Sequence, residues 1–205
     1  MTTQQQMPPQ SRIHFYSNWA KERIDEIDAT LASLESKAGG VQADVRAKAN
    51  QVLADLREKR DDFRDTIKKQ AESNEAAWIG ARARLETDWT AFEADVQKYI
   101  ETFGKQAEQR QATFQARTAA QLKSWNEMTD KLLGNAKEFA AERRGDIDAT
   151  VKRMKADAAA AQEKLEKLSR AGSESWSALN AALAETRAAF DRANLAAHDA
   201  FKRVK

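Results

Sequence analysis

One apolar stripe constrains the fold of this chain more than any other feature of the sequence. In residues 76–103, AAWIGARARLETDWTAFEADVQKYIETF, large apolar side chains recur at steps of three and four, and charged residues fill most of the other positions. That spacing places the apolar side chains on one face of an α-helix. The stripe consists of Trp78, Ala81, Leu85, Trp89, Phe92, Val96, Tyr99 and Phe103. The segment therefore predicts a long amphipathic helix whose apolar face must be covered.

A weaker copy of the stripe follows 98 residues later in the sequence. Its positions are Trp176, Leu179, Leu183, Thr186, Phe190, Asn194, Ala197 and Phe201. Most of them remain apolar, although Arg187 occupies the position that corresponds to Trp89. We therefore interpret the chain as two related halves, each ending in an amphipathic helix that runs from a tryptophan to a phenylalanine.

The composition favours an all-α fold. The chain of 205 residues contains only two prolines and seven glycines, which leaves little turn chemistry for a sheet protein of this length. Alanine and the other good helix formers dominate, as they do in long helices and coiled coils. Hydrophobic residues make up 41% of the chain and many are alanines, so we expect a thin core. The expected architecture is an elongated antiparallel coiled coil or helical bundle built from the two halves.

Breaks in the pattern divide the chain into four parts. Residues 1–10 are rich in glutamine and contain Pro8–Pro9, so they predict a disordered N-terminal lead. Residues 11–103 form the first helical repeat, and residues 114–205 form the second, diverged repeat. Between the repeats the stripe lapses in residues 104–113, which predict a junction.

Each repeat is itself interrupted. Residues 73–75 (Ser-Asn-Glu) and 172–174 (Gly-Ser-Glu) carry helix-capping chemistry at matching places, so we predict a helix boundary at both. At Gly39–Gly40 a turn and a kinked helix are both open. Two glycines cost a helix about 2 kcal/mol relative to two alanines, but the apolar pattern keeps its phase across them, which favours the kink. One continuous helix from Ile13 to Glu72 would be about 90 Å long.

The sequence offers no candidate for catalysis, and we expect no enzyme activity, cofactor, metal or small-molecule substrate. The two histidines are His14 and His198, and neither follows a glutamate by three residues, the spacing of a helix-borne metal pair. We interpret both as surface residues. Cysteine is absent, which excludes disulfides and thiolate metal sites. Glycine-rich phosphate loops, nucleophile elbows and HExxH zinc motifs do not occur.

Charge and hydropathy limit the partners that we expect. The 34 basic and 32 acidic residues are mixed along the chain and leave a formal net charge of +2, so no nucleic-acid partner is expected. No segment approaches the roughly 20 apolar residues that span a membrane. The N-terminal residues lack the basic and then apolar pattern of a secretory signal. The resulting expectation is a cytoplasmic protein.

The aromatic residues of the two stripes are the candidate interaction residues. Tryptophans are large for a two-stranded coiled coil. They indicate either a wider core of three or four helices, or exposed anchors for a membrane interface or a protein partner. The helix-packing or interaction stripe is predicted at Trp78, Leu85, Trp89, Phe92, Val96, Tyr99, Phe103, Trp176, Leu183, Phe190 and Phe201.

Three features of the first repeat carry a resemblance to a known family. They are the segment Trp19–Ala38 (WAKERIDEIDATLASLESKA), the run ADLREKRDDFRDTIKKQAES from Ala54, and the aromatic residues Trp78, Trp89 and Phe92. Together they resemble small bacterial coiled-coil proteins labelled stress-response proteins, of the cyanobacterial type, here in a tandem-duplicated form. The resemblance covers residues 12–103 and, more faintly, 114–201. It implies a non-enzymatic helical protein and transfers no catalytic or binding residues.

Two functions from different classes follow from these patterns. The first is a coiled-coil scaffold or interaction protein, linked by the resemblance to stress, that self-associates or binds another helical protein. The alternative is an amphipathic-helix coat on a lipid or polymer-granule surface, comparable to phasins or apolipoproteins, in which the stripe lies in the interface. A nucleic-acid binder, which would lose affinity steeply with salt, is a third hypothesis.

Overall fold

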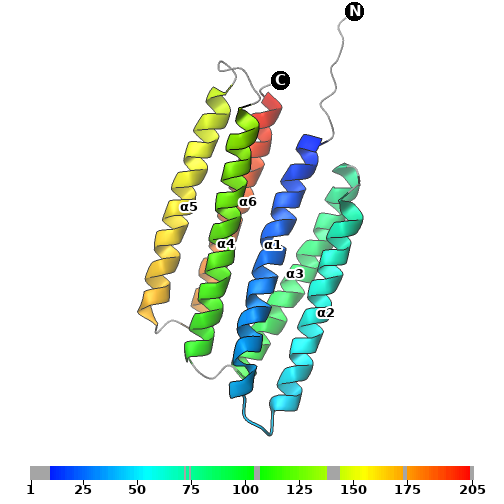
Figure 1. Cartoon of the computed structure of the whole chain (residues 1–205), viewed down its shortest axis with the longest axis vertical. Coiled ribbons are helices and arrows are strands. Elements are labelled where there is room, and N and C mark those ends of the chain that lie inside the picture. Colours follow the sequence, from blue (N-terminus) through cyan, green and yellow to red (C-terminus); the bar gives the residue numbers. More distant parts are fainter. Residues whose placement is uncertain are drawn as a thin grey trace, which may run out of the picture.

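The chain folds into long antiparallel helices. The computed structural model describes residues 10–71, 73, 75–103, 107–137, 144–172 and 175–203, and no strand occurs among them. The helices are α1 (Gln10–Lys37), the 3₁₀ turn η1 (Ala38–Gly40), α2 (Arg46–Gln70), α3 (Glu75–Phe103), α4 (Ala107–Ala136), α5 (Gly145–Ala171) and α6 (Trp176–Arg203). They run alternately down and up along one elongated molecule (Figure 1). The predicted all-α fold and antiparallel helical bundle are confirmed.

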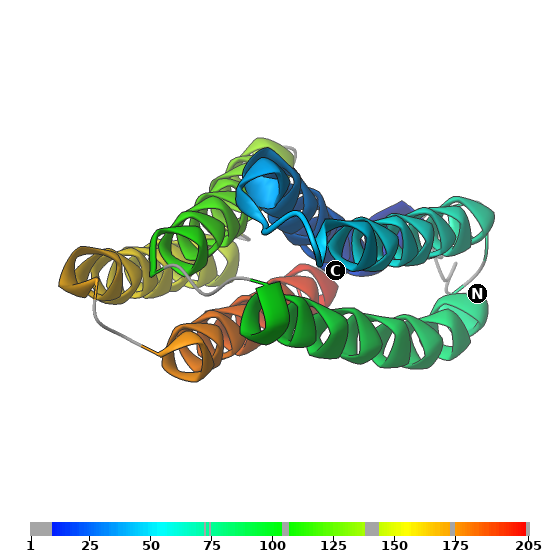
Figure 2. The ribbon, with the colours of Figure 1, turned by 90° about the horizontal axis from the view of Figure 1, so that it is seen from below.

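The six α-helices pack as two groups of three that lie side by side. Helices α1, α2 and α3 contact one another, and so do α4, α5 and α6. Helix α1 joins the groups because it packs along α4 and also contacts α6. Helices α2 and α5 lie at opposite edges of the molecule (Figures 1 and 2). We call the two groups the first and second units. That the two units are copies of one repeated sequence stays a prediction.

Each unit has an apolar interior. The largest cluster contains buried side chains of the first unit such as Trp19, Leu53 and Phe63, and it continues into the second unit through Phe114 on α4, Leu165 on α5, and Trp176 and Leu183 on α6. In the second unit a smaller cluster consists of Trp125, Met128, Met154, Phe190, Ala193 and Ala197. A third cluster, at the C-terminal end of α4, holds Ala136, Ile147, Val151 and Ala200. The stripes of the sequence are thus covered by helices of the same chain.

Gly39–Gly40 form a turn, and the expected kinked helix is wrong. Helix α1 ends at Lys37, the two glycines belong to η1, and α2 returns antiparallel to α1. The Arg46 guanidinium donates hydrogen bonds to the Gly39 carbonyl at 3.3 Å and the Val41 carbonyl at 3.1 Å, which bridges the turn. The apolar pattern keeps its phase because α1 and α2 turn their stripes to the same core. A helix of about 90 Å therefore does not form.

The other predicted boundaries fall close to their expected places. Helix α5 ends before Gly172, whose φ of 66° is the left-handed conformation typical of a glycine helix end. Helix α2 ends at Gln70 and α3 begins at Glu75, as the capping pattern predicted. At α6 the cap that the structure describes is Ser175, whose hydroxyl accepts a hydrogen bond from the Ala178 amide at 3.2 Å.

Several predicted segments lie wholly or partly outside the described residues. Residues 1–9 of the N-terminal lead are outside, and Gln10 already belongs to α1. Residues 104–106 of the junction are outside as well, whereas residues 107–113 form the first two turns of α4. These turns lack large apolar residues because they bury polar side chains instead, among them Gln109 and Thr113.

Truncation of a stripe tryptophan tests the packing of the first unit. Trp78 is buried and stacks on Tyr16 with 5.8 Å between ring centroids. Replacement of Trp78 by alanine is expected to lower the free energy of unfolding by about 3–5 kcal/mol, because it leaves a large cavity. Urea denaturation monitored by circular dichroism measures the loss. The neighbouring Ile79 is 57% exposed, so Ile79→Ala is the matched control and should cost less than about 0.5 kcal/mol. Equal losses would contradict the packing.

A buried ionic cluster as the candidate functional site

Part of the contact between the two units is polar. Where α1 meets α4, the Ser33 and Thr113 hydroxyls lie 3.0 Å apart, and the Ser124 hydroxyl donates to the Asp25 carboxylate at 3.3 Å. The buried residues of this contact, which we call the polar seam, are Glu26, Thr30 and Ser33 on α1, and Thr113, Arg117, Gln121 and Ser124 on α4. The two units are therefore connected by hydrogen bonds and charges along the polar seam as well as by the apolar cluster that they share.

Four charged side chains form a closed ring at the centre of the molecule. Glu26 comes from α1, Glu93 from α3, Arg117 from α4 and Arg187 from α6. Glu26 Oε1 accepts from Arg117 Nε at 2.7 Å and from Arg187 Nη2 at 2.9 Å. Glu93 Oε1 accepts from Arg117 Nη2 at 2.8 Å and from Arg187 Nη2 at 3.0 Å. We call this set the ionic ring.

Further polar groups complete the coordination of the ring. Glu26 Oε2 accepts from Gln121 Nε2 at 3.0 Å and from Arg187 Nε at 3.2 Å, while Arg117 Nη1 donates to Asn180 Oδ1 at 3.0 Å. Glu26 is 0% exposed and Arg117 is 1% exposed. An ion pair as deeply buried as this one is stable only when its hydrogen-bonding groups are satisfied. The ring meets that condition because four helices supply partners.

The ring holds its charges against the effect of burial. Burial alone pushes the pKa of Glu26 upward, but the Arg187 and Arg117 guanidiniums outweigh it and lower that pKa to about 2. Burial likewise lowers the pKa of Arg187, and the Glu26 and Glu93 carboxylates outweigh it, so that pKa lies above its ordinary value. The shifts of Glu26 and Arg187 both favour the charged form of the side chain.

A cation–π contact lies beside the ring. The Arg187 guanidinium lies 4.4 Å from the centroid of the Trp89 ring, within cation–π distance. Arg187 belongs to α6 and Trp89 to α3, so this pair is a further contact between the two units.

A second charged group lies beside the ring, between α1 and α6. Arg23 binds Asp191 with two hydrogen bonds, Nη1 to Oδ1 at 2.7 Å and Nη2 to Oδ2 at 2.6 Å. Arg23 Nη1 also donates to Glu22 Oε2 at 2.8 Å. We call Glu22, Arg23 and Asp191 the α1–α6 trio. Burial raises the pKa of Glu22 to about 7, against the opposing effect of Arg23.

The stripe predicted from the sequence lies in the core rather than on the surface. Among the predicted residues, the structure buries Trp78, Leu85, Trp89, Phe92, Val96, Tyr99, Trp176, Leu183 and Phe190. Phe103 is half-buried and packs against the same cluster, and the Phe201 side chain lies outside the described part of the chain. The stripe thus supports the wider helical core and leaves the described residues without an exposed aromatic face.

The sequence interpretation missed the ionic cluster. Its signal was a second helical spacing: Glu22, Glu26, Thr30 and Ser33 follow one face of α1. Polar residues at this spacing usually lie on an exposed helix face, so the pattern alone does not indicate burial. The expected surface position of His198 is also wrong, since its side chain is only 10% exposed and its ring lies 5.3 Å from that of Phe15. The His14 side chain is outside the described residues.

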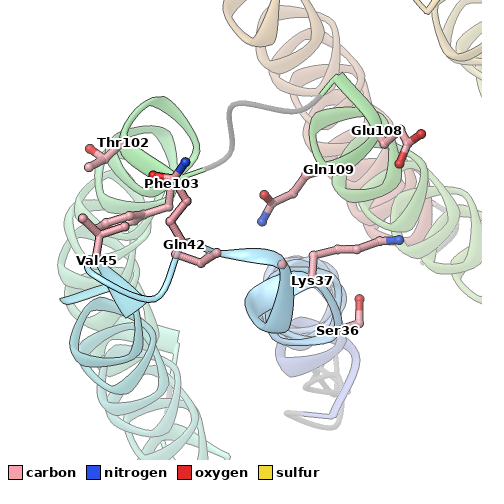
Figure 3. A pocket seen from close by; sticks show the side chains of 10 residues that line it. Ser36, Lys37, Gln42, Val45, Thr102, Phe103, Glu108 and Gln109 are labelled. Atoms are coloured by element: carbon pink, nitrogen blue, oxygen red, sulfur yellow. The ribbon is translucent and has the colours of Figure 1, made fainter. Parts of the chain in front are cut away.

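A pocket of about 330 Å³ lies where η1 meets the end of α3 and the start of α4 (Figure 3). Gln109 points into the hollow from α4, whereas Lys37 extends alongside α4 and Glu108 points away (Figure 3). Phe103, Val41 and Val45 form an apolar part of the wall. Because the charged groups do not converge on one point, the pocket lacks the arrangement that catalysis or tight ligand binding requires.

Within the described ranges, no group of three or more histidine and acidic side chains is placed to hold a metal ion. None of the described helices combines the length and the apolar character needed to cross a membrane. No protein-family model, curated protein or solved structure matches the chain. The resemblance to bacterial coiled-coil stress-response proteins therefore stays a prediction.

Removal of the central charge tests the ionic ring. Glu26→Gln keeps the shape of the side chain but leaves Arg117 and Arg187 with only Glu93 as a charged partner in the ring. The free energy of unfolding is expected to fall by about 3–5 kcal/mol, as for other broken buried ion pairs. Chemical denaturation at pH 7 measures it. Glu101→Gln is the control, because Glu101 is exposed and contacts Gln97 on its own helix. A loss no larger than that of the control would show that the ring does not stabilise the fold.

Proposed function

We propose that this chain is a non-enzymatic helical scaffold that binds proteins, either a second copy of itself or another helical protein, through its outer helix faces. The observation that carries the proposal is the inward orientation of both stripes. Because the chain covers its own apolar faces, a partner meets long charged helices instead. Among the described residues, the exposed large hydrophobic side chains are Ile79 and Leu195.

The outer faces have charge of both signs. On α5, Lys167 pairs with Glu163 at 2.7 Å and Arg170 with Glu166 at 3.1 Å. Helices of 25 to 30 residues present faces about 37–45 Å long. Mixed charge along such a face suits another helix of complementary pattern, and it offers little attraction to a polyanion such as a nucleic acid.

The ionic ring supports a scaffold role because it fixes how the helices align. Arg117 and Arg187 each reach Glu26 and Glu93 at the same time, so a shift of one helix by a turn would leave buried charges unpaired. Buried polar groups are used in this way to specify the register of coiled coils. A fixed register keeps the outer faces rigid, which a scaffold requires.

Light scattering over a concentration and salt series tests the scaffold. A monomer has a mass of 23.0 kDa. If the outer faces self-associate, the average mass should rise with protein concentration and fall back as salt screens the charges. Lys167→Glu combined with Arg170→Glu, at two exposed positions of α5, should shift the equilibrium toward monomer, while Ile79→Ala on α3 should not. The proposal would be contradicted if the mass stayed at that of the monomer and chemical cross-linking also captured no helical partner protein.

A second candidate function, a coat on a lipid or polymer-granule surface, is favoured by the tryptophans. The indole N–H groups of Trp19, Trp78, Trp89, Trp125 and Trp176 are all buried without a hydrogen-bond partner among the described residues. An unpaired buried donor costs about 1–3 kcal/mol. Indole rings find both apolar contact and a hydrogen bond at a membrane interface. Separation of the units along the polar seam would bring Trp89 and Trp176 to such a surface.

A disulfide across the polar seam tests this second function. Ser33 and Thr113 touch through their hydroxyls, and the chain has no cysteine, so Ser33→Cys with Thr113→Cys introduces a single pair. Flotation with phosphatidylcholine vesicles compares the oxidised and reduced protein. The coat predicts binding after reduction and at least a tenfold loss after oxidation. The single variant Ser33→Cys, which cannot form the disulfide across the polar seam, is the control and should bind both after reduction and after oxidation. Absence of binding by the reduced protein, or equal binding in both states, would contradict a coat function in which the units separate along the polar seam to bind lipid.

A further inference from the structure

The buried charges around α1 are not balanced. The ionic ring contains two carboxyl groups and two guanidinium groups, so it is neutral when fully ionised. The α1–α6 trio contains two carboxyl groups, on Glu22 and Asp191, but only the guanidinium of Arg23. If every member were ionised, the trio would hold one uncompensated negative charge. Such a charge is costly where water is excluded.

The geometry identifies Glu22 as the carboxyl group in excess. Both terminal nitrogens of Arg23 bind Asp191, which is the stronger, bidentate arrangement. Glu22 receives one hydrogen bond from Arg23, and within the described structure its Oε1 has no hydrogen-bond partner. Glu22 is 0% exposed, whereas the Asp191 side chain is 26% exposed and contacts water. The cheaper way to neutralise the trio is therefore to protonate Glu22.

We propose that Glu22 binds a proton in the folded protein, and that loss of this proton loosens the packing of α1 against α6, so that the trio acts as a pH-sensitive latch between the two units. The latch is a property of the folded chain and does not depend on the partner proposed above. Once ionised, Glu22 lies one helical turn from the ionised Glu26 and beside Asp191. Separation of α1 from α6 relieves this repulsion because it admits water to all three carboxylates.

The groups around Glu22 on every adjoining helix support this assignment. The charged groups that act on Glu22 are Arg23 and Glu26 on α1, and Arg187 and Asp191 on α6. Next to these, Arg82 of α3 packs on Trp19, and Arg117 of α4 binds both Glu26 and Glu93 of α3. Burial is the largest influence on the pKa of Glu22 and raises it, and Glu26 and Asp191 raise it further. Arg23 and Arg187 lower it without cancelling the rise, which leaves the pKa at about 7. Helix α1 thus carries two carboxyl groups, Glu22 and Glu26, whose pKa values are shifted in opposite directions.

The sign of the pH effect follows from the raised pKa. In the unfolded chain Glu22 has the ordinary glutamate pKa of 4.5. The folded protein therefore holds a proton that the unfolded chain has lost between about pH 4.5 and 7. The contribution of Glu22 to stability is complete below the unfolded pKa and is lost as pH rises through the folded pKa. Over that window the folding equilibrium constant should fall about tenfold for each pH unit, and it should level off above pH 7.

Urea unfolding of wild type and Glu22→Gln between pH 5 and 8 tests the latch. Glutamine imitates the protonated carboxyl group, so the variant should lack the pH dependence that Glu22 supplies. The folding constant of the variant divided by that of wild type should rise about tenfold per unit from pH 5 to 7 and then level off. This ratio cancels the titration of groups that do not interact with Glu22. Glu101→Gln, at an exposed site on α3 that contacts Gln97 of the same helix, is the matched control and should give a flat ratio. A flat ratio for Glu22→Gln would overturn the proposal.

Wild-type measurements keep the test decisive if Glu22→Gln does not fold. Carbon-13 NMR of protein labelled at the glutamate carboxyl carbons should show one group that titrates near pH 7. Amide hydrogen exchange should show that α1 and α6 lose protection relative to α2 from pH 6 to 8, after correction for the intrinsic rate. Titration of every glutamate below about pH 5.5 would overturn the latch, and so would unchanged relative protection.

Discussion

The arrangement of this molecule depends on one interaction, the contact of the Glu26 carboxylate with two arginines from the other unit. A carboxylate that is fully removed from water is unstable unless cations and hydrogen-bond donors surround it. Glu26 obtains Arg117 and Gln121 from α4 and Arg187 from α6. These partners are available only when the second unit lies against α1. The Glu26 carboxylate can therefore stay buried and ionised only in the closed bundle, in which the second unit packs against the first.

Apolar and polar contacts stabilise this bundle in different ways. Tryptophan, phenylalanine and leucine side chains form the apolar core, whose largest cluster extends across both units. Between the units the polar seam and the ionic ring tolerate no sliding, because each donor has a defined acceptor. The closed bundle therefore has a single alignment of its helices. The cost is an interior in which, among the described residues, the five indole N–H groups and the Glu22 Oε1 atom have no hydrogen-bond partner.

The sequence predicted the apolar part of this structure better than the polar part. The three-and-four spacing of Leu85, Phe92 and their neighbours is a local pattern, so it correctly identified helices with buried faces. The ionic ring joins residues 91 and 161 positions apart, and a buried glutamate has the same spacing signal as an exposed one. Gly39–Gly40 was misread because two antiparallel helices that share a core keep the same phase as one continuous helix. Only the direction of the returning chain distinguishes them, and that is decided by tertiary packing.

A double-mutant cycle between Glu26 and Arg187 tests the central claim most directly. The free energies of unfolding of wild type, Glu26→Gln, Arg187→Met and the double variant would be measured by urea denaturation at pH 7. If the two units are held by this charge pair, the coupling free energy should be about 1–3 kcal/mol, and the double variant should be more stable than the sum of the single losses implies. A coupling within about 0.5 kcal/mol of zero would show that the side chains act independently, and the account of a bundle closed by a buried charge would be wrong.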